Sequence, residues 1–570
     1  MTSPHETSAP TGSAPAAAGS AELDPKRWLA LTVVLVAAFM DLLDVTIVNV
    51  AIPSIQRNLN AGYSEIQWVA AGYTLAFAAG LITGGRLGDI YGRKLIFLIG
   101  VIGFTVASTL SGVATDPQFL IGARVLQGAM AALMVPQILA IIQATFPQGE
   151  RGKVVGMYGA IAGLALVCGP IVGGLLVQYN IFGLHWRSIF LVNVPVGVLG
   201  IIATFAFVRE SKSETAKKLD IGGVILCAVG VLLLVYPLTE GRELRWPVWT
   251  WVMIAGSVVV LAGFVLYCRE VARRGGSPLL PLDLFRARSF AAGFATNLVF
   301  NLATGAFFLM FTLYMQIGLG WTPIHAGLTG IPYSVGLSIA AAMSVQYLAP
   351  SLGRYTLIMG GILLALATLL LIGTTARYGA TIHSWEMIPA LLLMGGGVGL
   401  IVAPLIDFAL TDVPTSEAGS ASGGINMTWQ IGTTIGIALV GVIFLSPLSP
   451  QAGRSVDSMA PQLTNQLSVA GVPNALQAPI IAGYKVCAED LAGETDPTVT
   501  PASCKQAPPS SLGAQTAAQV EKILEADTPT VQAKAFTHAL QIGLYVVIGL
   551  SLLVTAMMFS LPKKAKPQEA

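Results

Sequence analysis

Long runs of apolar residues, separated by short polar segments, dominate the chain. A bilayer with a hydrocarbon core about 30 Å thick needs about 20 residues of apolar helix to cross it. Fourteen runs meet this requirement: 29–52, 68–85, 95–115, 118–142, 154–178, 188–208, 221–239, 249–268, 290–316, 325–349, 355–373, 387–410, 418–446 and 539–561. The pattern therefore predicts an all-α integral membrane protein with 14 transmembrane helices.

Composition and charge support this class and set the orientation. Of the 570 residues, 54% are apolar and only 11% are charged, too few charges for the surface of a soluble chain of this length. The net charge of +2 gives no sign of nucleic-acid binding. With the N-terminus inside, twenty Lys and Arg residues fall on the cytoplasmic side and five in the short outer loops. We therefore expect both termini in the cytoplasm. We also expect the membrane to be the cytoplasmic membrane of a bacterium.

A faint internal repeat divides the chain. Gly92-Arg93, after the second run, aligns with Gly353-Arg354, after the tenth, although the acid at Asp89 has no counterpart. Transporter halves show internal symmetry of this kind. We expect two six-helix bundles with an inserted helix pair: a disordered cytoplasmic tail without a signal peptide (1–27), the N-terminal bundle (28–208), spans 7 and 8 with flanking cytoplasmic loops (209–289), spans 9 to 13 (290–446), an extracytoplasmic insert (447–536), and span 14 with a cytoplasmic tail (537–570).

Three charged residues lie deep within apolar runs, where charge is costly and indicates function. Asp41 and Asp44, three positions apart, share one face of the first helix. Asp44 and Arg124 lie roughly 10 Å and 9 Å below the outer surface, so we predict that they pair. A fixed ion pair would only orient the helices. We favour proton coupling through Asp44 with Arg124, with Asp41 as second candidate, and we interpret Asp407 as interfacial.

The polar insert differs from the rest of the chain. Residues 447–536 are rich in Pro, Ala, Gln, Ser and Thr, and the topology places them outside. That compartment is oxidising, so we expect a disulfide between Cys487 and Cys504, the alternative being two free thiols in a flexible loop. Stretches such as 514–526 would form short amphipathic helices, and whether the insert binds a partner is left open. The cysteines are too few and too scattered to indicate a metal site.

Five motifs resemble those of the major facilitator superfamily, specifically its fourteen-span drug:proton antiporter branch. They are LDVTIVNVAIP at 43–53 in span 1, GRLGDIYGRK at 85–94 in loop 2–3, RVLQG at 124–128 in span 4, GPIVGG at 169–174 in span 5, and WRSIFLVNVPVG at 186–197 at the start of span 6. They cover spans 1 to 6 densely, whereas spans 9 to 14 are supported mainly by topology and by residues 419–432. The resemblance implies the major facilitator fold and links Arg124 to proton transfer.

The resemblance also implies a gate and a bend. The gate would be a cytoplasmic latch, closed in the outward-facing state, built from Gly85, Asp89, Gly92, Arg93 and Lys94. Anchoring by positive charge alone would explain the two basic residues but not the acid. The bend in span 5, which the family couples to antiport, would involve Gly169, Pro170, Gly173 and Gly174. Close helix packing is the alternative reading of these small residues.

The substrate site is less evident. Polar residues within spans are candidates for lining a cavity: Gln137, Asn297, Asn301, Asn426 and Gln430. Each would serve equally well in a helix–helix hydrogen bond. A mostly apolar cavity with one or two acids would suit lipophilic or cationic compounds.

The leading hypothesis is a proton-coupled antiporter that exports lipophilic or amphipathic drugs or natural products by alternating access. Its partners would be a lipophilic small molecule, protons and the lipid bilayer, with no nucleic acid and no cofactor. The sequence contains no G-x-x-x-x-G-K-[ST] loop for ATP. The alternatives are a transporter of lipids or cell-envelope precursors and a non-transporting receptor or scaffold. A membrane enzyme is the weakest, since no catalytic cluster is visible.

Overall fold

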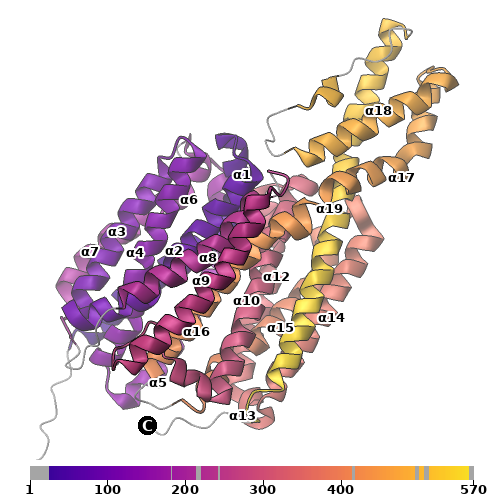
Figure 1. The fold of residues 1–570 in the computed structure, drawn as a ribbon. Coiled ribbons are helices and arrows are strands. Elements are labelled where there is room, and N and C mark those ends of the chain that lie inside the picture. Colours follow the sequence, from indigo (N-terminus) through magenta and orange to yellow (C-terminus); the bar gives the residue numbers. More distant parts are fainter. Residues whose placement is uncertain are drawn as a thin grey trace, which may run out of the picture.

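The computed structural model describes residues 25–180, 183–212, 220–241, 244–413, 418–494, 500–505 and 512–563. Within these ranges the regular elements are helices, and no strand is found. Long helices lie side by side in one elongated body, and a smaller helical part projects from one end (Figure 1). We call this end the insert end. The all-α prediction is confirmed.

Three groups of helices follow the expected order along the chain. The N-terminal bundle contains α1 (Arg27–Leu59), α2 (Tyr63–Tyr91), α3 (Arg93–Gly112), α4 (Pro117–Thr145), α5 (Gln148–Gln178), the short η2 (His185–Arg187) and α6 (Ser188–Leu191), and α7 (Asn193–Phe207). The inserted pair is α8 (Ile221–Glu240) and α9 (Val248–Arg273), followed by η3 (Leu282–Arg286).

The C-terminal bundle has more breaks in its helices. Its elements are α10 (Arg288–Leu313) with η4 (Tyr314–Gly318), α11 (Pro323–Thr329), α12 (Ile331–Met343), η5 (Ser344–Leu348), α13 (Ala349–Leu352), α14 (Tyr355–Tyr378), η6 (Gly379–Thr381), α15 (Ser384–Leu410), α16 (Ala418–Val440) with η8 (Gly441–Leu445), and the last part of α19 (Ala514–Met558).

The number of membrane-spanning helices is compatible with fourteen. Twelve helices in the described part are long and apolar enough to cross a membrane, and α2, bent by 46° near its middle, makes a thirteenth. Helix α5 occupies the position of the predicted fifth span, but only its segment Cys168–Gln178 qualifies as a shorter apolar helix.

The two bundles pack together at the insert end. One hydrophobic cluster joins the last part of α1, such as Ile47 and Ile55, to C-terminal helices through residues such as Phe311. The first part of α1 instead packs in a cluster formed within the N-terminal bundle alone, and Phe290 of α10 belongs to a cluster of the C-terminal half with η3. The cores are therefore shared at the insert end and separate at the opposite end.

The faint repeat has a structural counterpart. The N–H of Arg93 donates to the carbonyl of Ser211 over 2.9 Å, just after α7, and the N–H of Arg354 donates to the carbonyl of Lys563 over 3.0 Å, just after α19. In each half, the loop that follows the second span is thus hydrogen-bonded to the segment that follows the sixth span. Gly92 has a φ of 124°, a left-handed conformation that favours glycine.

The insert is mostly helical and continuous with the C-terminal bundle. It contains α17 (Leu448–Val469), α18 (Asn474–Gly493), η9 (Ala502–Lys505) and the first part of α19. Only two residues separate η8 from α17, and α19 runs without a break through the expected boundary at 537. The expectation that 514–526 forms a separate short helix is wrong, because polar helix-forming residues extend the last span outward.

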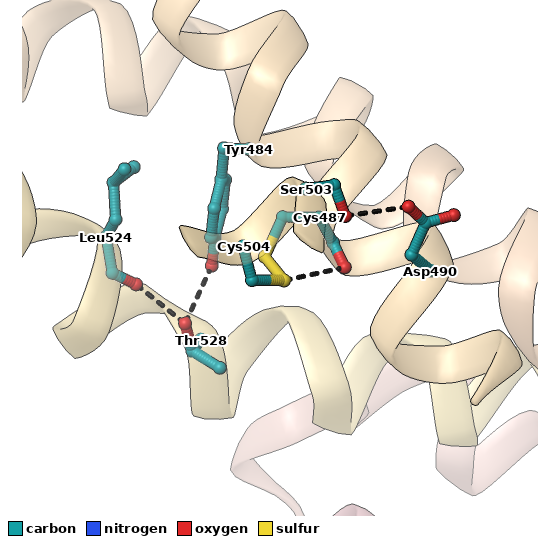
Figure 2. The surroundings of a disulfide bond; sticks show 7 residues. All are labelled: Tyr484, Cys487, Asp490, Ser503, Cys504, Leu524 and Thr528. Atoms are coloured by element: carbon teal, nitrogen blue, oxygen red, sulfur yellow. Dashed lines mark hydrogen bonds between the residues drawn. A yellow bond between two sulfur atoms is a disulfide. The ribbon is translucent and has the colours of Figure 1, made fainter. Parts of the chain in front are cut away.

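Small hydrophobic clusters hold the insert together, one of them formed around Val456, Leu463 and Tyr484. Cys487 and Cys504 form the predicted disulfide, with their Cα atoms 4.7 Å apart. Near it, the Ser503 hydroxyl donates to Asp490 over 2.7 Å (Figure 2). The disulfide therefore ties η9 to α18.

Replacing Cys487 by Ser should loosen the insert. The disulfide closes a loop with a sequence separation of 17, and a loop of this size stabilises the folded state by about 3 kcal/mol. We expect faster hydrogen exchange in α18 and η9, with unchanged exchange in α1 to α5. The matched control is Cys168→Ser, which removes a free thiol. Equal exchange of the insert in both variants would contradict this prediction.

Candidate functional site

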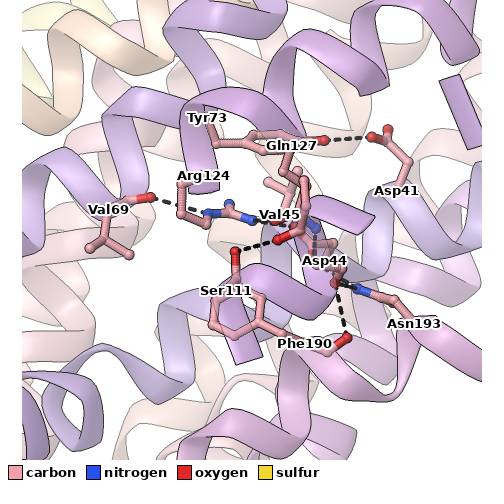
Figure 3. Close-up of polar contacts among 12 residues, drawn as sticks. Asp41, Asp44, Val45, Val69, Tyr73, Ser111, Arg124, Gln127, Phe190 and Asn193 are labelled. Carbon is pink, nitrogen blue, oxygen red and sulfur yellow. Dashed lines mark hydrogen bonds and ion pairs between the residues drawn. The ribbon is translucent and has the colours of Figure 1, made fainter. Parts of the chain in front are cut away.

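A buried ion pair joins α1 to α4. The guanidinium Nη1 of Arg124 lies 2.6 Å from Oδ2 of Asp44 (Figure 3). The side chain of Asp44 is 0% exposed and that of Arg124 is 2% exposed, so both charges are removed from water. The depths estimated from the sequence predicted this pairing, and the structure brings the two side chains together.

Two amides complete the surroundings of the Asp44 carboxylate. Its Oδ1 accepts hydrogen bonds from Gln127 and from Asn193, each over 2.9 Å. Gln127 also accepts a bond from Arg124 over 2.7 Å, and Asn193 also donates to Ser108 over 3.1 Å. Helices α1, α4 and α7 therefore meet at one carboxylate, and Ser108 connects α3 to it through Asn193. Its charge is balanced by one cation and two neutral donors, which a buried carboxylate requires.

Asp41 lies in a separate polar contact beside this pair. It accepts a 2.5 Å hydrogen bond from the hydroxyl of Tyr73 on α2, as Figure 3 shows. The guanidinium of Arg124 lies over the ring of the same tyrosine, 4.4 Å from its centroid. Tyr73 thus contacts both Asp41 and the cation that holds Asp44, and it joins the two carboxylates into one network.

A cavity of about 250 Å³ lies between the two bundles. Tyr73 and Arg124 belong to its wall, together with residues of α1, α5, α10, α12, α15 and α16. The network around Asp44 therefore reaches a space large enough to admit part of a small molecule. Among the described residues that line this cavity there is no Asp or Glu, so the acid expected in a drug cavity is not found in its wall.

Of the polar residues proposed for substrate binding, one lines the cavity and the others do not. Asn301 lines the cavity. Gln137 donates to the carbonyl of Gly84 over 2.8 Å, and Asn297 donates to that of Ile425 over 2.9 Å, so both make helix–helix contacts. Asn426 and Gln430 are not among the cavity-lining residues either.

The loop 2–3 residues form a charge cluster at the end opposite the insert. Asp89 and Arg93 form an ion pair over 3.1 Å, and Arg93 also donates to the carbonyl of Ala140 on α4. The carboxylate of Glu210 accepts from the N–H of Lys94 over 3.0 Å. These contacts lie within the N-terminal bundle. Gly85 and Gly92 complete the motif, the latter as the turn between α2 and α3.

The glycines of α5 permit close approach on two sides. A Cβ on Gly169 would lie 1.8 Å from the Thr46 hydroxyl of α1, and one on Gly173 would lie 2.8 Å from Ile47. On the other side, a Cβ on Gly174 would lie 2.7 Å from Ile324 of α11. Pro170 lies in the same helix, within the cavity wall. The motif therefore lies where α5 contacts both its own bundle and the opposite one.

Sequence reasoning missed several residues of the site. Gln127 follows Arg124 by one helical turn, a spacing that places them on one face, so this partner was open to prediction. Asn193 and Tyr73 come from distant runs, and nothing in their spacing relates them to Asp44. Within the described part of the chain, no cluster of three or more His, Cys, Asp or Glu residues is placed to hold a metal ion.

Comparison with known proteins identifies similar sequences. A family model for the Major Facilitator Superfamily matches residues 34–437. A probable actinorhodin transporter of Streptomyces coelicolor is 40% identical over 547 residues, covering 95% of this chain and 93% of that protein. A puromycin resistance protein of Streptomyces alboniger is 35% identical, covering 74% and 82%. A tetracenomycin C resistance and export protein of Streptomyces glaucescens is 33% identical, covering 74% and 76%.

Solved structures share the fold. A bacterial homologue of the human lysosomal transporter Spinster, in an inward-facing and occupied conformation, superposes with a TM-score of 0.57. The superposition covers 94% of this chain and 96% of that one, at 13% sequence identity. At this identity the likeness concerns the arrangement of the helices alone.

Removing one member of the buried pair should cost more than removing both. Arg124→Leu leaves the Asp44 carboxylate without its cation, and a broken buried pair costs about 3–5 kcal/mol. We expect the double variant Asp44→Leu/Arg124→Leu to recover part of this loss in the free energy of unfolding, measured by titration with a denaturing detergent. A double variant whose loss equals the sum of the two single losses would contradict a direct interaction.

Proposed function

Because the chain belongs to the major facilitator superfamily and is thus a membrane transporter rather than an enzyme, we propose that it exports lipophilic or amphipathic compounds, drugs or natural products, in exchange for protons. The observation that carries this proposal is the contact of the buried Asp44–Arg124 pair with the cavity wall. The names of three relatives, which describe antibiotic transport, resistance or export, support the class of substrate.

In this proposal Asp44 carries the exchanged proton. The carboxylate holds Arg124, Gln127 and Asn193 through its negative charge. A proton on Asp44 removes that charge and weakens all three hydrogen bonds, since bonds to a charged acceptor are roughly twice as strong as neutral ones. Arg124 then loses its anion while it remains buried. Because an unpaired buried charge is costly, a rearrangement of the surrounding helices becomes favourable.

Arg124 and Tyr73 would transmit this change to the substrate. Both line the cavity, and the guanidinium lies over the tyrosine ring. A shift of Arg124 after protonation alters the surface that the substrate contacts, while Tyr73 remains tied to Asp41. Proton binding and substrate binding would thus oppose each other, which is the requirement for exchange rather than cotransport.

Alternating access would occur by movement of one bundle against the other. The shared core at the insert end and the separate core of the N-terminal bundle support a state closed at the insert end. Hydrogen bonds reinforce that closure: Gln316 donates to the carbonyl of Val50 over 2.8 Å, and Gln67 donates to that of Ile437 over 3.1 Å. Opening would require α5 to separate from α11 beside Gly174, which assigns the span 5 motif a role in gating.

The proposed orientation places the insert outside and both termini in the cytoplasm. Loop 2–3 then lies on the cytoplasmic side. Its Asp89–Arg93 pair is already formed within the N-terminal bundle in the state described here, so a latch of the outward-facing state would need this loop to make a further contact with the C-terminal bundle. The disulfide in the insert is consistent with an oxidising outer compartment. The state described above would face inward and take up its substrate from the cytoplasm or from the inner leaflet.

Asp44→Asn should abolish proton-driven transport while leaving substrate exchange intact. The amide keeps the shape of the carboxylate but cannot bind and release a proton. In everted vesicles with an imposed proton gradient, we expect wild-type protein to accumulate at least one compound from a panel of lipophilic dyes and antibiotics. Accumulation by Asp44→Asn should fall at least about tenfold, the effect of 1.4 kcal/mol. Exchange of labelled for unlabelled substrate without a gradient should persist.

The matched control is Asp407→Asn, which neutralises an acid of α15 outside this network and outside the described cavity lining. It should accumulate substrate like wild type. Gradient-driven accumulation by Asp44→Asn at the wild-type level would refute the coupling role of Asp44. Loss of exchange as well as accumulation would instead indicate a role in folding or substrate binding.

A further inference from the structure

The wall of the cavity is unusually aromatic on its C-terminal side. Its aromatic members there are Phe300, Phe307, Phe308, Phe311, Tyr333 and Trp429. The rings of Phe307 and Phe311 are nearly parallel, with an interplanar angle of 16° and centroids 5.3 Å apart, and Tyr333 lies at 24° to Phe307. Flat rings in similar orientations offer stacking and edge contacts to another flat ring.

The polar part of the described wall carries no charge that is free to bind an ion. Arg124 is its only charged member, and that guanidinium is already held by Asp44. The other polar members are amides and hydroxyls, such as Asn301 and Thr304. A buried organic cation would find no anion here, and a buried anion would compete with Asp44. Burying an unpaired ion costs several times more than one cation–π contact returns.

One amide in the wall, that of Gln316, has a carbonyl oxygen that accepts no hydrogen bond. Gln316 is 7% exposed and lines the cavity. Its amide nitrogen donates to the carbonyl of Val50 over 2.8 Å, whereas its Oε1 atom is buried and has no hydrogen-bond partner. A ligand that brings a hydroxyl or N–H group would satisfy this acceptor once a movement of the Gln316 side chain opens Oε1 to the cavity, and an unmade bond is costly.

Resting on the proposed export function, we propose that the cavity selects uncharged, flat aromatic compounds that donate a hydrogen bond to Gln316, and that it discriminates against permanent cations. The aromatic side chains of α10 and α12 bind the ring system, and the amide of Gln316 binds a hydroxyl or N–H group at its edge. This goes beyond export of lipophilic compounds in general, because it names the charge and the donor group that the wall recognises.

Three anthraquinones that differ in one substituent test this inference. They carry a hydroxymethyl, a methoxymethyl or a trimethylammoniomethyl group, so that a neutral donor, a neutral non-donor and a cation share one ring system. Their binding to purified wild-type protein in lipid nanodiscs is measured by equilibrium dialysis, with empty nanodiscs as the blank. The hydroxymethyl compound should bind about fivefold more tightly than its methyl ether. It should bind at least about tenfold more tightly than the cation.

Matched variants test which residues cause the discrimination against the cation and the preference for a hydrogen-bond donor. Asn301→Asp introduces an acid into the wall and should raise the affinity for the cation at least about tenfold. The control, Gln137→Glu, makes the same amide-to-acid change at a buried residue of α4 outside the described lining, and it should bring no such gain. Gln316→Met should reduce the difference between hydroxymethyl and methoxymethyl compounds to about onefold. Thermal melting of each variant with and without ligand shows whether it is folded.

The outcomes separate this inference from the proposed function. Wild-type protein that binds the cation as tightly as the neutral donor overturns the inference, whatever the transport assays give. Equal affinity for the hydroxymethyl and methoxymethyl compounds removes the role of Gln316. The predicted selectivity in binding, combined with unaltered accumulation by Asp44→Asn, supports the substrate class and refutes the proton-coupling mechanism instead.

Discussion

The burial of one ion pair constrains the rest of the N-terminal bundle. Two opposite charges held away from water are tolerable only when each finds a partner at short distance, and Asp44 and Arg124 meet at 2.6 Å. The remaining lone pairs and donors then require Gln127 and Asn193. Three helices thereby contact each other at one carboxylate, and α3 is linked to it through Asn193. A site of this kind is costly for stability alone. In the proposed mechanism, a change of charge at its centre moves the helices around it.

The cavity and the ion pair share the same side chains. Arg124 and Tyr73 contact the carboxylates on one side and border the space between the bundles on the other. Apolar and aromatic side chains on the C-terminal side complete the wall. The N-terminal bundle thus contributes the titratable groups, while the C-terminal bundle contributes most of the surface for a substrate. Proton coupling at Asp44 and selection of uncharged aromatic compounds therefore involve the same cavity. Each of these two proposals is tested by a different experiment.

Packing at the two ends of the molecule differs, and small residues allow the close contact between bundles at the insert end. Glycines of α5 and α11 allow their backbones to approach closely across the bundle interface, as at Gly174 and Gly327. At the opposite end each bundle keeps its own apolar core. The insert is joined to the C-terminal bundle through α17 and α19, so it would move with that bundle as a unit.

The membrane class, the helix pattern, the internal repeat and the Asp44–Arg124 pair could be predicted from the amino-acid sequence, because period, length and depth along a helix are local properties. It also indicated the disulfide, from two cysteines in one polar segment. The folded chain was needed to see that Asn193 and Tyr73 join the site, that Asn297 packs between helices, and that α19 continues into the insert. Those contacts unite side chains from distant segments, and their geometry depends on how helices pack rather than on spacing along the chain.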